Sequence, residues 1–201
     1  RRSWQQRNRI IISKKEGYLT IPVIKKGKNN QLLKDTLIKD NNFYKNHLKN
    51  IYFNYSKTKF FNKYFEHLES LAEPIQSLNN LSEINILLIK KISNLLGMNS
   101  TFIKSSDLNL SGSKSEKLIN TCNLFNAKEY LSNEGATEYL KKDIDKFKIN
   151  NINVYIQNFN PTSYAQQSNQ FVPYMSILDM LFNEGNQSLD IIRSCIEIQK
   201  I

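Results

Sequence analysis

The feature that most constrains this fold is an alternation of two periodicities between residues 101 and 159. TFIKSS (101–106), AKEYLS (127–132) and INVYIQNF (152–159) are short runs with β-branched and aromatic residues, which are typical of strands. KSEKLINTCNLF (114–125) and ATEYLKKDIDKF (136–147) lie between them and carry apolar residues at helical spacing. Strands that alternate with helices favour right-handed crossovers. The pattern therefore predicts an α/β fold with a parallel βαβαβ, Rossmann-like sheet in the C-terminal half.

The N-terminal half has a different pattern. RIIIS and YLTIPVI flank Gly17 and predict a hairpin or two short strands. From Asn42 the period becomes helical, and two aromatic-rich helices are expected before a break at Pro74. We expect these helices, with the next one, to form a helical insert over about residues 42–97.

Three more helices complete the predicted elements. One spans about Leu81 to Leu96, with Ser82 as a possible cap and Gly97 as its end. The other two are YMSILDMLFNEG (174–185) and QSLDIIRSCIEI (187–198). No linker or internal repeat divides the sequence, so a single domain over 1–201 is predicted.

Composition narrows the class of protein. A chain of 201 residues with 40% hydrophobic residues can bury one core. No apolar run reaches the roughly 18–20 residues of a membrane span, and no signal peptide is evident. Cys122 and Cys195 are far apart and, with two histidines, show no metal-ligand spacing. We expect free buried thiols, a cytoplasmic location, and neither a metal nor a cofactor.

The formal net charge of +10 has two explanations. It suits an acidic partner such as a nucleic acid, a phosphate or an anionic surface. The lysines are scattered, however, and an A/T-rich coding sequence would also enrich Lys, Asn and Ile. Charge alone does not decide between these explanations.

Small polar residues follow the predicted strands. The first turn contains Gly112, Lys114 and Ser115, directly before a helix, and free amides at a helix start bind phosphate. The alternative is that Ser113 or Ser115 simply caps that helix. The next turn contains Ser132 and Gly135, with Tyr139 one helical turn later, and NFNPTSYAQQ follows the third strand. Because strand ends share one edge of a parallel sheet, we expect a pocket for a hydroxylated, phosphate-bearing ligand.

Two further segments are candidates for the site. His47 has the side chain best suited to proton transfer near neutral pH, although a histidine on an aromatic helix is often a core residue. RRSWQQRNRI concentrates arginines, amides and the only tryptophan at one end of the chain. It is either a basic arm for polyanions or one wall of a site. Arginines that alternate with amides and lead into a strand favour the wall, with Arg fixing phosphate or carboxylate and Trp4 stacking.

Four segments together resemble the WbqC-like family. They are RRSWQQRNRI with GYLTIPV, FYKNHLKNIYFNYSKTKFFNKYF, SSDLNLSGSKSEKLINTC with AKEYLSNEGATEYL, and VPYMSILDMLFNEG. Their order and spacing match along essentially the whole chain. The resemblance implies a bacterial protein of polysaccharide biosynthesis, found with O-antigen genes, for which glycyl transfer to an amino sugar is the suggested role.

The resemblance also implies the residues of the site. His47 and Asp179 are the catalytic candidates it supports, and the substrate-binding candidates it supports are Trp4, Arg7, Asn8, Arg9, Gly112, Lys114, Ser115, Ser132 and Gly135. Tyr139 is a further substrate-binding candidate because of its position after the second polar turn. The expected partners are a nucleotide-linked amino sugar and a glycyl donor such as a charged tRNA. The alternatives are a non-catalytic module that binds nucleotide sugars or RNA, and a structural protein with an exposed apolar helix face at FNKYFEHL.

The chain departs from the family pattern in three places. GSKSEK stands where the family usually reads Gly-Lys-Ser-Glu-Arg, and Ser-Asn stands in place of Ser-Gly after the second predicted strand. The family's opening His-Gln-Pro and Tyr-Leu-Pro-Trp stretch does not occur in this sequence. We therefore expect a WbqC-like domain that is incomplete at its N-terminal side.

Overall fold

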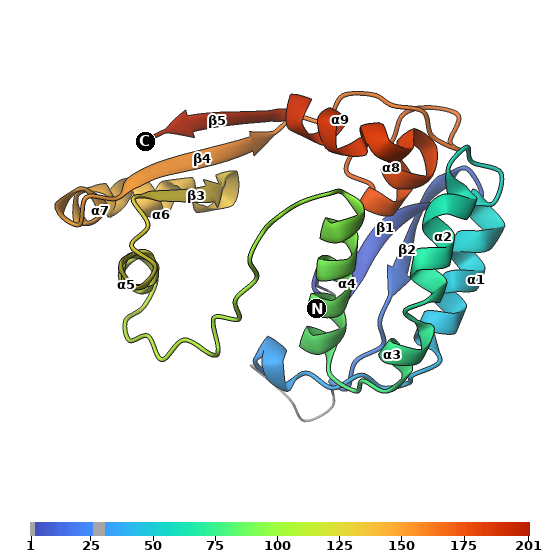
Figure 1. Ribbon diagram of the computed structural model, residues 1–201, viewed down its shortest axis with the longest axis horizontal. Coiled ribbons are helices and arrows are strands. Elements are labelled where there is room, and N and C mark those ends of the chain that lie inside the picture. The colour runs from blue at the N-terminus through green and yellow to red at the C-terminus, as the bar shows by residue number, and fades with distance from the viewer. Residues whose placement is uncertain (1–2, 26–30) are drawn as a thin grey trace. The chain divides into compact units, whose positions relative to one another are not determined.

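The computed structural model describes residues 3–25 and 31–201, which form two compact units (Figure 1). The hairpin unit comprises Arg1–Phe102 and Thr162–Ile191, and the sheet unit comprises Ile103–Pro161 and Ile192–Ile201. Each unit has its own hydrophobic core. The fold is mixed α/β, as predicted, whereas the single domain over 1–201 stays a prediction.

A β-hairpin begins the hairpin unit. β1 (Arg7–Ile12) pairs antiparallel with β2 (Lys15–Thr20), which confirms the predicted hairpin. The turn is formed by Ser13 and Lys14, both with positive φ, and Gly17 lies inside β2. Two left-handed residues give a turn whose twist matches that of the strands.

Helices pack around this hairpin, and helices are present over the predicted insert, about residues 42–97. Its last helix is capped by Asn80, not by Ser82: the Asn80 side chain accepts bonds from two backbone amides, at 2.8 and 3.3 Å. Gly97 follows the helix with a φ of 70°. The helices of this unit are α1 (Phe43–Tyr55), α2 (Phe61–Glu69), α3 (Ala72–Gln76), α4 (Leu81–Leu95), α8 (Ile177–Glu184) and the short 3-10 helices η1 (Leu33–Asp35) and η3 (Gly185–Gln187).

Aromatic side chains join the hairpin to these helices. Ile10 and Ile11 of β1 are fully buried against Tyr55 of α1. Phe182 of α8 contacts Tyr55 and Phe61, with ring centroids 5.2 and 5.4 Å apart. Such rings bury large apolar areas, so this core fixes β1 relative to α1 and α8.

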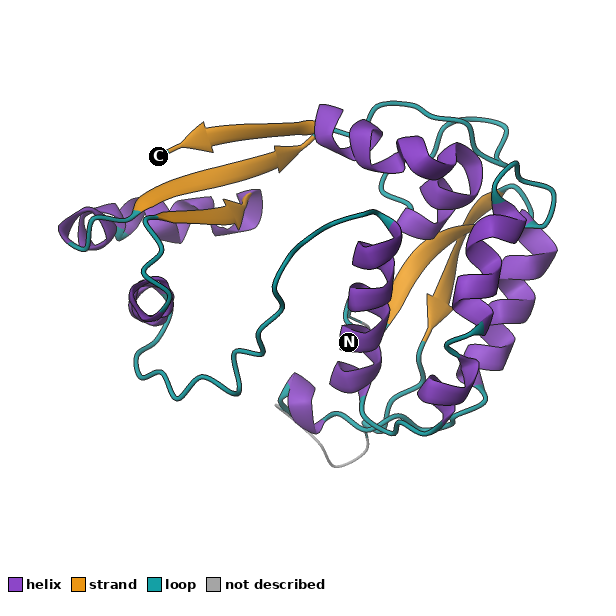
Figure 2. Ribbon diagram, in the orientation of Figure 1, coloured by secondary structure: helices purple, strands orange, loops and turns teal. Residues whose placement is uncertain are grey.

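The sheet unit is built on three strands. β3 (Glu129–Asn133) and β4 (Asn153–Phe159) are parallel, and β5 (Ile196–Lys200) is antiparallel to β4. Its helices lie to one side of the strands in Figure 2, and Ile119, Leu140, Phe147, Val154 and Ile156 form the core between them. These helices are α5 (Ser115–Leu124), η2 (Glu134–Ala136), α6 (Thr137–Lys142) and α7 (Ile144–Ile149), and α9 (Ser188–Ser194) spans the boundary between the units.

The parallel βαβαβ sheet is therefore only partly present. β3, α6, α7 and β4 form one βαβ element, but residues 101–106 form no strand. Phe102 and Ile103 are exposed and belong to no core cluster, so no apolar contact draws this run into the sheet. The last predicted helix is also wrong at its end, because residues 196–200 form β5. The resulting sheet is mixed, and a Rossmann-like sheet is not formed.

Two expectations from the composition concern membrane spans and the cysteine thiols. No helix in the described part of the chain is long and apolar enough to cross a membrane. Cys122 and Cys195 are both buried and are not joined in a disulfide, which confirms the prediction of buried thiols. Burial raises the pKa of the Cys122 thiol and lowers its reactivity.

Candidate functional site

Arginines and aromatic rings gather on one face of the hairpin. The Arg7 guanidinium carbon lies 4.4 Å from the centroid of Tyr18 and 5.4 Å from that of Trp4. The Arg9 guanidinium carbon lies 5.5 Å from Trp4 and 5.8 Å from Tyr174. We call these five residues the arginine–aromatic cluster. All of them belong to the hairpin unit.

The register of the hairpin explains this cluster. Arg9 lies directly opposite Tyr18, and Arg7 is two residues away on the same strand face. Cation–π attraction then holds both guanidinium groups against the rings. Trp4 and Tyr174 remain more than half exposed, at 61% and 55%, so the cluster is open to solvent.

One carboxylate orients part of the cluster. Glu16 accepts a hydrogen bond from the Tyr18 hydroxyl at 2.7 Å and forms an ion pair of 3.4 Å with Arg9. The hydrogen bond from Tyr18, together with the two arginines, lowers the pKa of Glu16. The Nε atoms of Arg7 and Arg9 are buried and have no hydrogen-bond partner among the described residues. The arginines therefore keep donor capacity that the cluster itself does not use.

A pocket of about 570 Å³ adjoins this cluster within the hairpin unit. Trp4, Arg7, Asn8 and His47 all contribute to its lining, so four of the predicted site residues meet there. Aliphatic side chains supply most of the rest: Leu19, Ile21, Leu33, Ile51, Leu68, Ile86, Leu88, Ile89, Ile92, Ile177 and Leu178. A largely apolar pocket with a few convergent polar groups is typical of a small-molecule site.

His47 is half-buried in this pocket. Its Nε2 lies 3.1 Å from the Thr20 carbonyl oxygen, and its ring packs edge-on against Phe43. Burial lowers the pKa of the imidazole. Because a carbonyl can only accept, Nε2 carries the proton of the neutral ring, which leaves Nδ1 as the acceptor. The neutral side chain is thus suited to take up a proton.

Asp179 lies deeper, with no exposed surface. Its carboxylate accepts hydrogen bonds from Tyr55 Oη at 2.7 Å, Tyr164 Oη at 2.8 Å and Gln166 Nε2 at 3.0 Å. Burial raises the pKa of Asp179, although these three bonds oppose the shift. It is absent from the pocket lining, so its bonds serve protein groups rather than an open surface.

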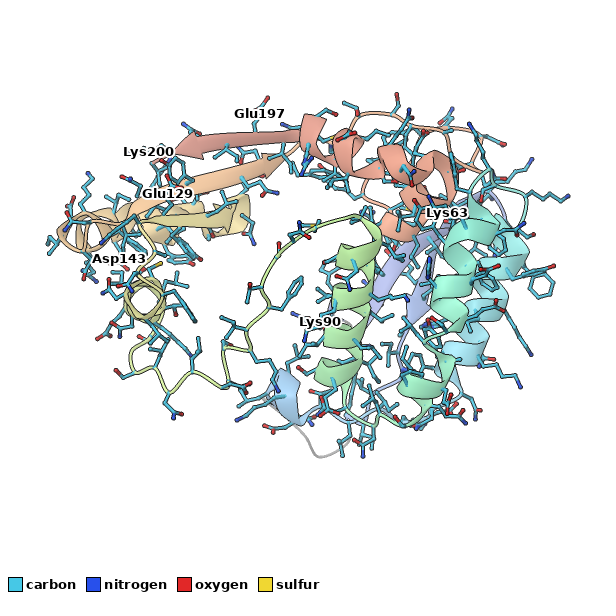
Figure 3. The ribbon with its side chains drawn as sticks, viewed as in Figure 1. Lys63, Lys90, Glu129, Asp143, Glu197 and Lys200 are labelled. Atoms are coloured by element: carbon cyan, nitrogen blue, oxygen red, sulfur yellow. The ribbon has the colours of Figure 1, made fainter. Side chains whose placement is uncertain are left out.

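The remaining predicted residues belong to the sheet unit. Ser115 is buried at the first turn of α5, after Gly112 and Lys114, both of which have positive φ. Lys114 occupies the N-cap position and makes no side-chain capping bond, so the expected serine cap is not formed. The Lys146 ammonium, 2.7 Å from Oδ1 of Asp143, lowers the pKa of Asp143, which lies between α6 and α7 (Figure 3).

The second polar turn follows β3. Ser132 is half-buried in the strand, Gly135 lies in η2, and Tyr139 is in α6. Burial and a hydrogen bond with Tyr130 raise the pKa of Tyr139. The expected pocket at three successive parallel strand ends is not formed, because residues 101–106 are not a strand. The structure therefore divides the predicted residues between the hairpin unit and the sheet unit.

Comparison with known proteins identifies the family. The model of the WbqC-like protein family matches residues 1–191. The chain belongs to the WbqC-like protein family. It is also 32% identical over 198 residues to the "Uncharacterized protein Rv1507c" of Mycobacterium tuberculosis (strain ATCC 25618 / H37Rv), covering 97% of this chain and 84% of that protein. No solved structure matches the chain significantly.

Sequence reasoning missed several residues of this WbqC-like site. Tyr18 and Glu16 could have been found from the hairpin, because cross-strand partners follow once the turn is placed at residues 13–14. Tyr55, Tyr164 and Tyr174 gave no such signal, since they reach the site from segments distant in sequence. Residues 3–25 and 31–201 contain no group of three or more His, Cys, Asp or Glu placed to hold a metal ion.

Proposed function

We propose that this protein acts in O-antigen polysaccharide biosynthesis by transferring a glycyl group to the amino group of a nucleotide-linked amino sugar. Membership of the WbqC-like family links the chain to O-antigen clusters. The observation that carries the proposal is the meeting of Trp4, Arg7 and a neutral His47 in the lining of one pocket, with Arg9 held against Trp4.

The cluster suits the nucleotide part of such a substrate. Guanidinium groups bind phosphate oxygens through paired N–H donors, and the unused Nε donors of both arginines add to this capacity. Trp4 and Tyr174 are exposed rings, and a planar base can stack on either. Glu16 lies beside Arg9, so a cationic amino group can also be held close to the phosphates.

His47 supplies the proton transfer. The sugar nitrogen attacks the glycyl carbonyl carbon, a C–N bond forms, and the C–O bond to the donor breaks. Nδ1 of His47 accepts the proton that the nitrogen loses and passes it to the donor oxygen as that oxygen leaves, which returns the ring to its neutral form. An activated ester such as a charged tRNA is a suitable donor. The lowered pKa of His47 keeps its ring unprotonated at neutral pH.

The sheet unit is proposed to contribute a separate phosphate contact. The amides at the start of α5 point toward its N-terminal end, where Lys114 adds a positive charge and Gly112 allows close approach. Ser132 near the end of β3 and Tyr139 in α6 are the polar side chains of the second predicted turn, and Gly135 lies between them in η2. Asp143 carries a negative charge near Ser115, and this charge repels phosphate and weakens its binding at this turn.

A second candidate function is a non-catalytic module that binds nucleotide sugars or RNA. It is supported by the exposed arginine–aromatic cluster and the net charge of +10, neither of which requires turnover. Binding that weakens steeply with salt for any polyanion supports the module. Selective binding of one nucleotide sugar supports the enzyme.

The decisive experiment is an incubation of the protein with a panel of nucleotide-linked amino sugars and glycyl-tRNA. Mass spectrometry then detects a sugar heavier by one glycyl residue. We expect His47→Ala to abolish the product while preserving nucleotide binding. No glycyl adduct across the panel, or full turnover by His47→Ala, would overturn the proposal.

A further inference from the structure

The buried carboxylate of Asp179 joins two segments that carry the arginine–aromatic cluster. We propose that Asp179 is a positioning residue that sets the geometry of this cluster through Tyr55 on one side and through Tyr164 and Gln166 on the other. The inference rests on the proposed function in one respect, that the cluster binds an anionic nucleotide. Its structural part can be measured without any ligand.

The first connection runs to β1. The Tyr55 hydroxyl donates to Oδ1 of Asp179 at 2.7 Å and accepts the backbone N–H of Ile11 at 2.8 Å. Ile11 is two residues from Arg9 on the same strand face. The carboxylate therefore fixes the backbone that carries Arg9. Burial and the charge of Asp179 raise the pKa of Tyr55, so its hydroxyl keeps the proton that this connection needs.

The second connection runs to the segment 164–176. Oδ2 of Asp179 accepts from Tyr164 at 2.8 Å and from Gln166 at 3.0 Å. Gln166 in turn donates to the Val172 carbonyl at 3.0 Å and accepts the Val172 N–H at 2.8 Å. This pair of bonds closes the loop just before Tyr174, whose ring lies over Arg9.

The two connections converge on Arg9. The N–H of Ser176 donates to the Arg9 carbonyl at 2.8 Å, so the loop and the strand are bonded directly as well. Tyr174 adopts a φ of 61°, a conformation that a tyrosine rarely adopts unless its surroundings hold it. Asp179, Gln166 and Ser176 are the groups that hold the backbone on either side of this residue.

The chemistry of the site requires a carboxylate. Three donors converge on two oxygens, and both oxygens must accept. An asparagine of the same shape would turn its NH₂ group toward one set of donors and lose those bonds. A buried carboxylate costs more to desolvate than an amide. Asparagine would be less costly to bury than Asp179, but it could not accept hydrogen bonds on both sides.

The test compares Asp179→Asn and the milder Tyr164→Phe with Ile75→Ala. Ile75 is fully buried in a second hydrophobic cluster of the hairpin unit, with Leu71 and Ile84, and it does not line the pocket. Its truncation therefore lowers stability without changing the hydrogen bonds of Asp179. Two readouts need no ligand: hydrogen exchange at the Ile11 amide, and the emission of Trp4, the only tryptophan in the chain. A third is the affinity for uridine diphosphate.

We expect both network variants to speed Ile11 exchange beyond the global unfolding rate and to shift the Trp4 emission. Uridine diphosphate should bind about tenfold more weakly, because the recognition side chains must then be ordered on binding. Ile75→Ala should lower the melting temperature while leaving Trp4 emission and affinity close to wild type.

Two results would overturn the inference: unchanged Ile11 exchange and Trp4 emission in Tyr164→Phe, or an equal loss of affinity in Ile75→Ala at matched stability. If the wild-type protein does not bind uridine diphosphate at all, the nucleotide site of the proposed function fails. The exchange and emission measurements then still decide whether Asp179 positions the cluster.

Discussion

Arg9 offers the sharpest test of the candidate site. Its guanidinium lies between Trp4 and Tyr174, forms an ion pair with Glu16, and keeps a buried Nε without a partner in the described part of the chain. Replacing it with lysine keeps the positive charge but removes the planar, paired donors. Replacing it with alanine removes both the charge and the donors.

The size of each effect follows from these contacts. An exposed cation–π contact contributes about 0.5–1 kcal/mol, and a hydrogen bond from a charged group about 1.5–3 kcal/mol. Arg9→Lys loses one donor of the pair and some stacking, so nucleotide binding should weaken by about 1.5 kcal/mol, or roughly tenfold. Arg9→Ala should cost about 2–4 kcal/mol.

Trp4 makes the assay direct. Because the chain has a single tryptophan, quenching of its emission during titration with uridine diphosphate reports this cluster alone. Uridine without phosphates is the neutral ligand control, and Lys141→Gln in α6 removes one positive charge from the sheet unit. Equal affinities for uridine and its diphosphate, or wild-type binding by Arg9→Ala, would refute the reasoning.

Three further predictions concern stability and pH. Asn80→Ala should lower the unfolding free energy by about 1–2 kcal/mol in urea titrations, because the start of α4 loses its cap; a change below about 0.3 would contradict this. Gly185→Ala should cost about 2–3 kcal/mol, since its Cβ would lie 2.6 Å from Phe60 at a φ of 62°; Gly97→Ala, at a φ of 70° with open space around it, should cost only about 1, and equal losses would refute the steric argument. Burial lowers the pKa of His47 in the folded protein, so the stability that its neutral ring contributes is fully present above about pH 6.5 and is lost as the pH falls through the lower folded pKa. The urea midpoints at pH 8 and pH 5 should therefore differ less in His47→Gln than in the wild type. An unchanged difference would contradict this assignment.

Local patterns predicted much of the hairpin unit. The aromatic residues of α2 recur at helical spacing, and this helix buries the predicted face. α1 forms as predicted but buries a face shifted from the predicted one, with Tyr44 and Tyr55 inside and Asn50 exposed. The hairpin followed from two β-branched runs, although its turn is at Ser13 and Lys14. Gly17 misled the sequence argument because glycine is common in turns, whereas here it lies opposite Ile10 within β2.

The sheet unit shows where local patterns fail. TFIKSS has the composition of a strand but forms none, and residues 196–198 were expected in a helix but pair with β4 as part of β5. A strand is stable only through hydrogen bonds to another strand, so short apolar runs are decided by the neighbours available to them. The expected pocket lacks one of its three strand ends for the same reason, because residues 101–106 form no strand.

The sequence by itself determined the family, the mixed α/β class and the helices of residues 42–97, and it predicted residues with recognition chemistry: the arginines, Trp4 and His47. These depend on side-chain type and on spacing within one element. Only the tertiary structure decided that Asp179 is buried, that Tyr55 and Tyr164 donate to it from two distant segments, and that Tyr174 lies over Arg9. Such contacts join residues up to 124 positions apart, as in Tyr55 and Asp179, and they form because packing around one core brings distant donors to the same buried carboxylate.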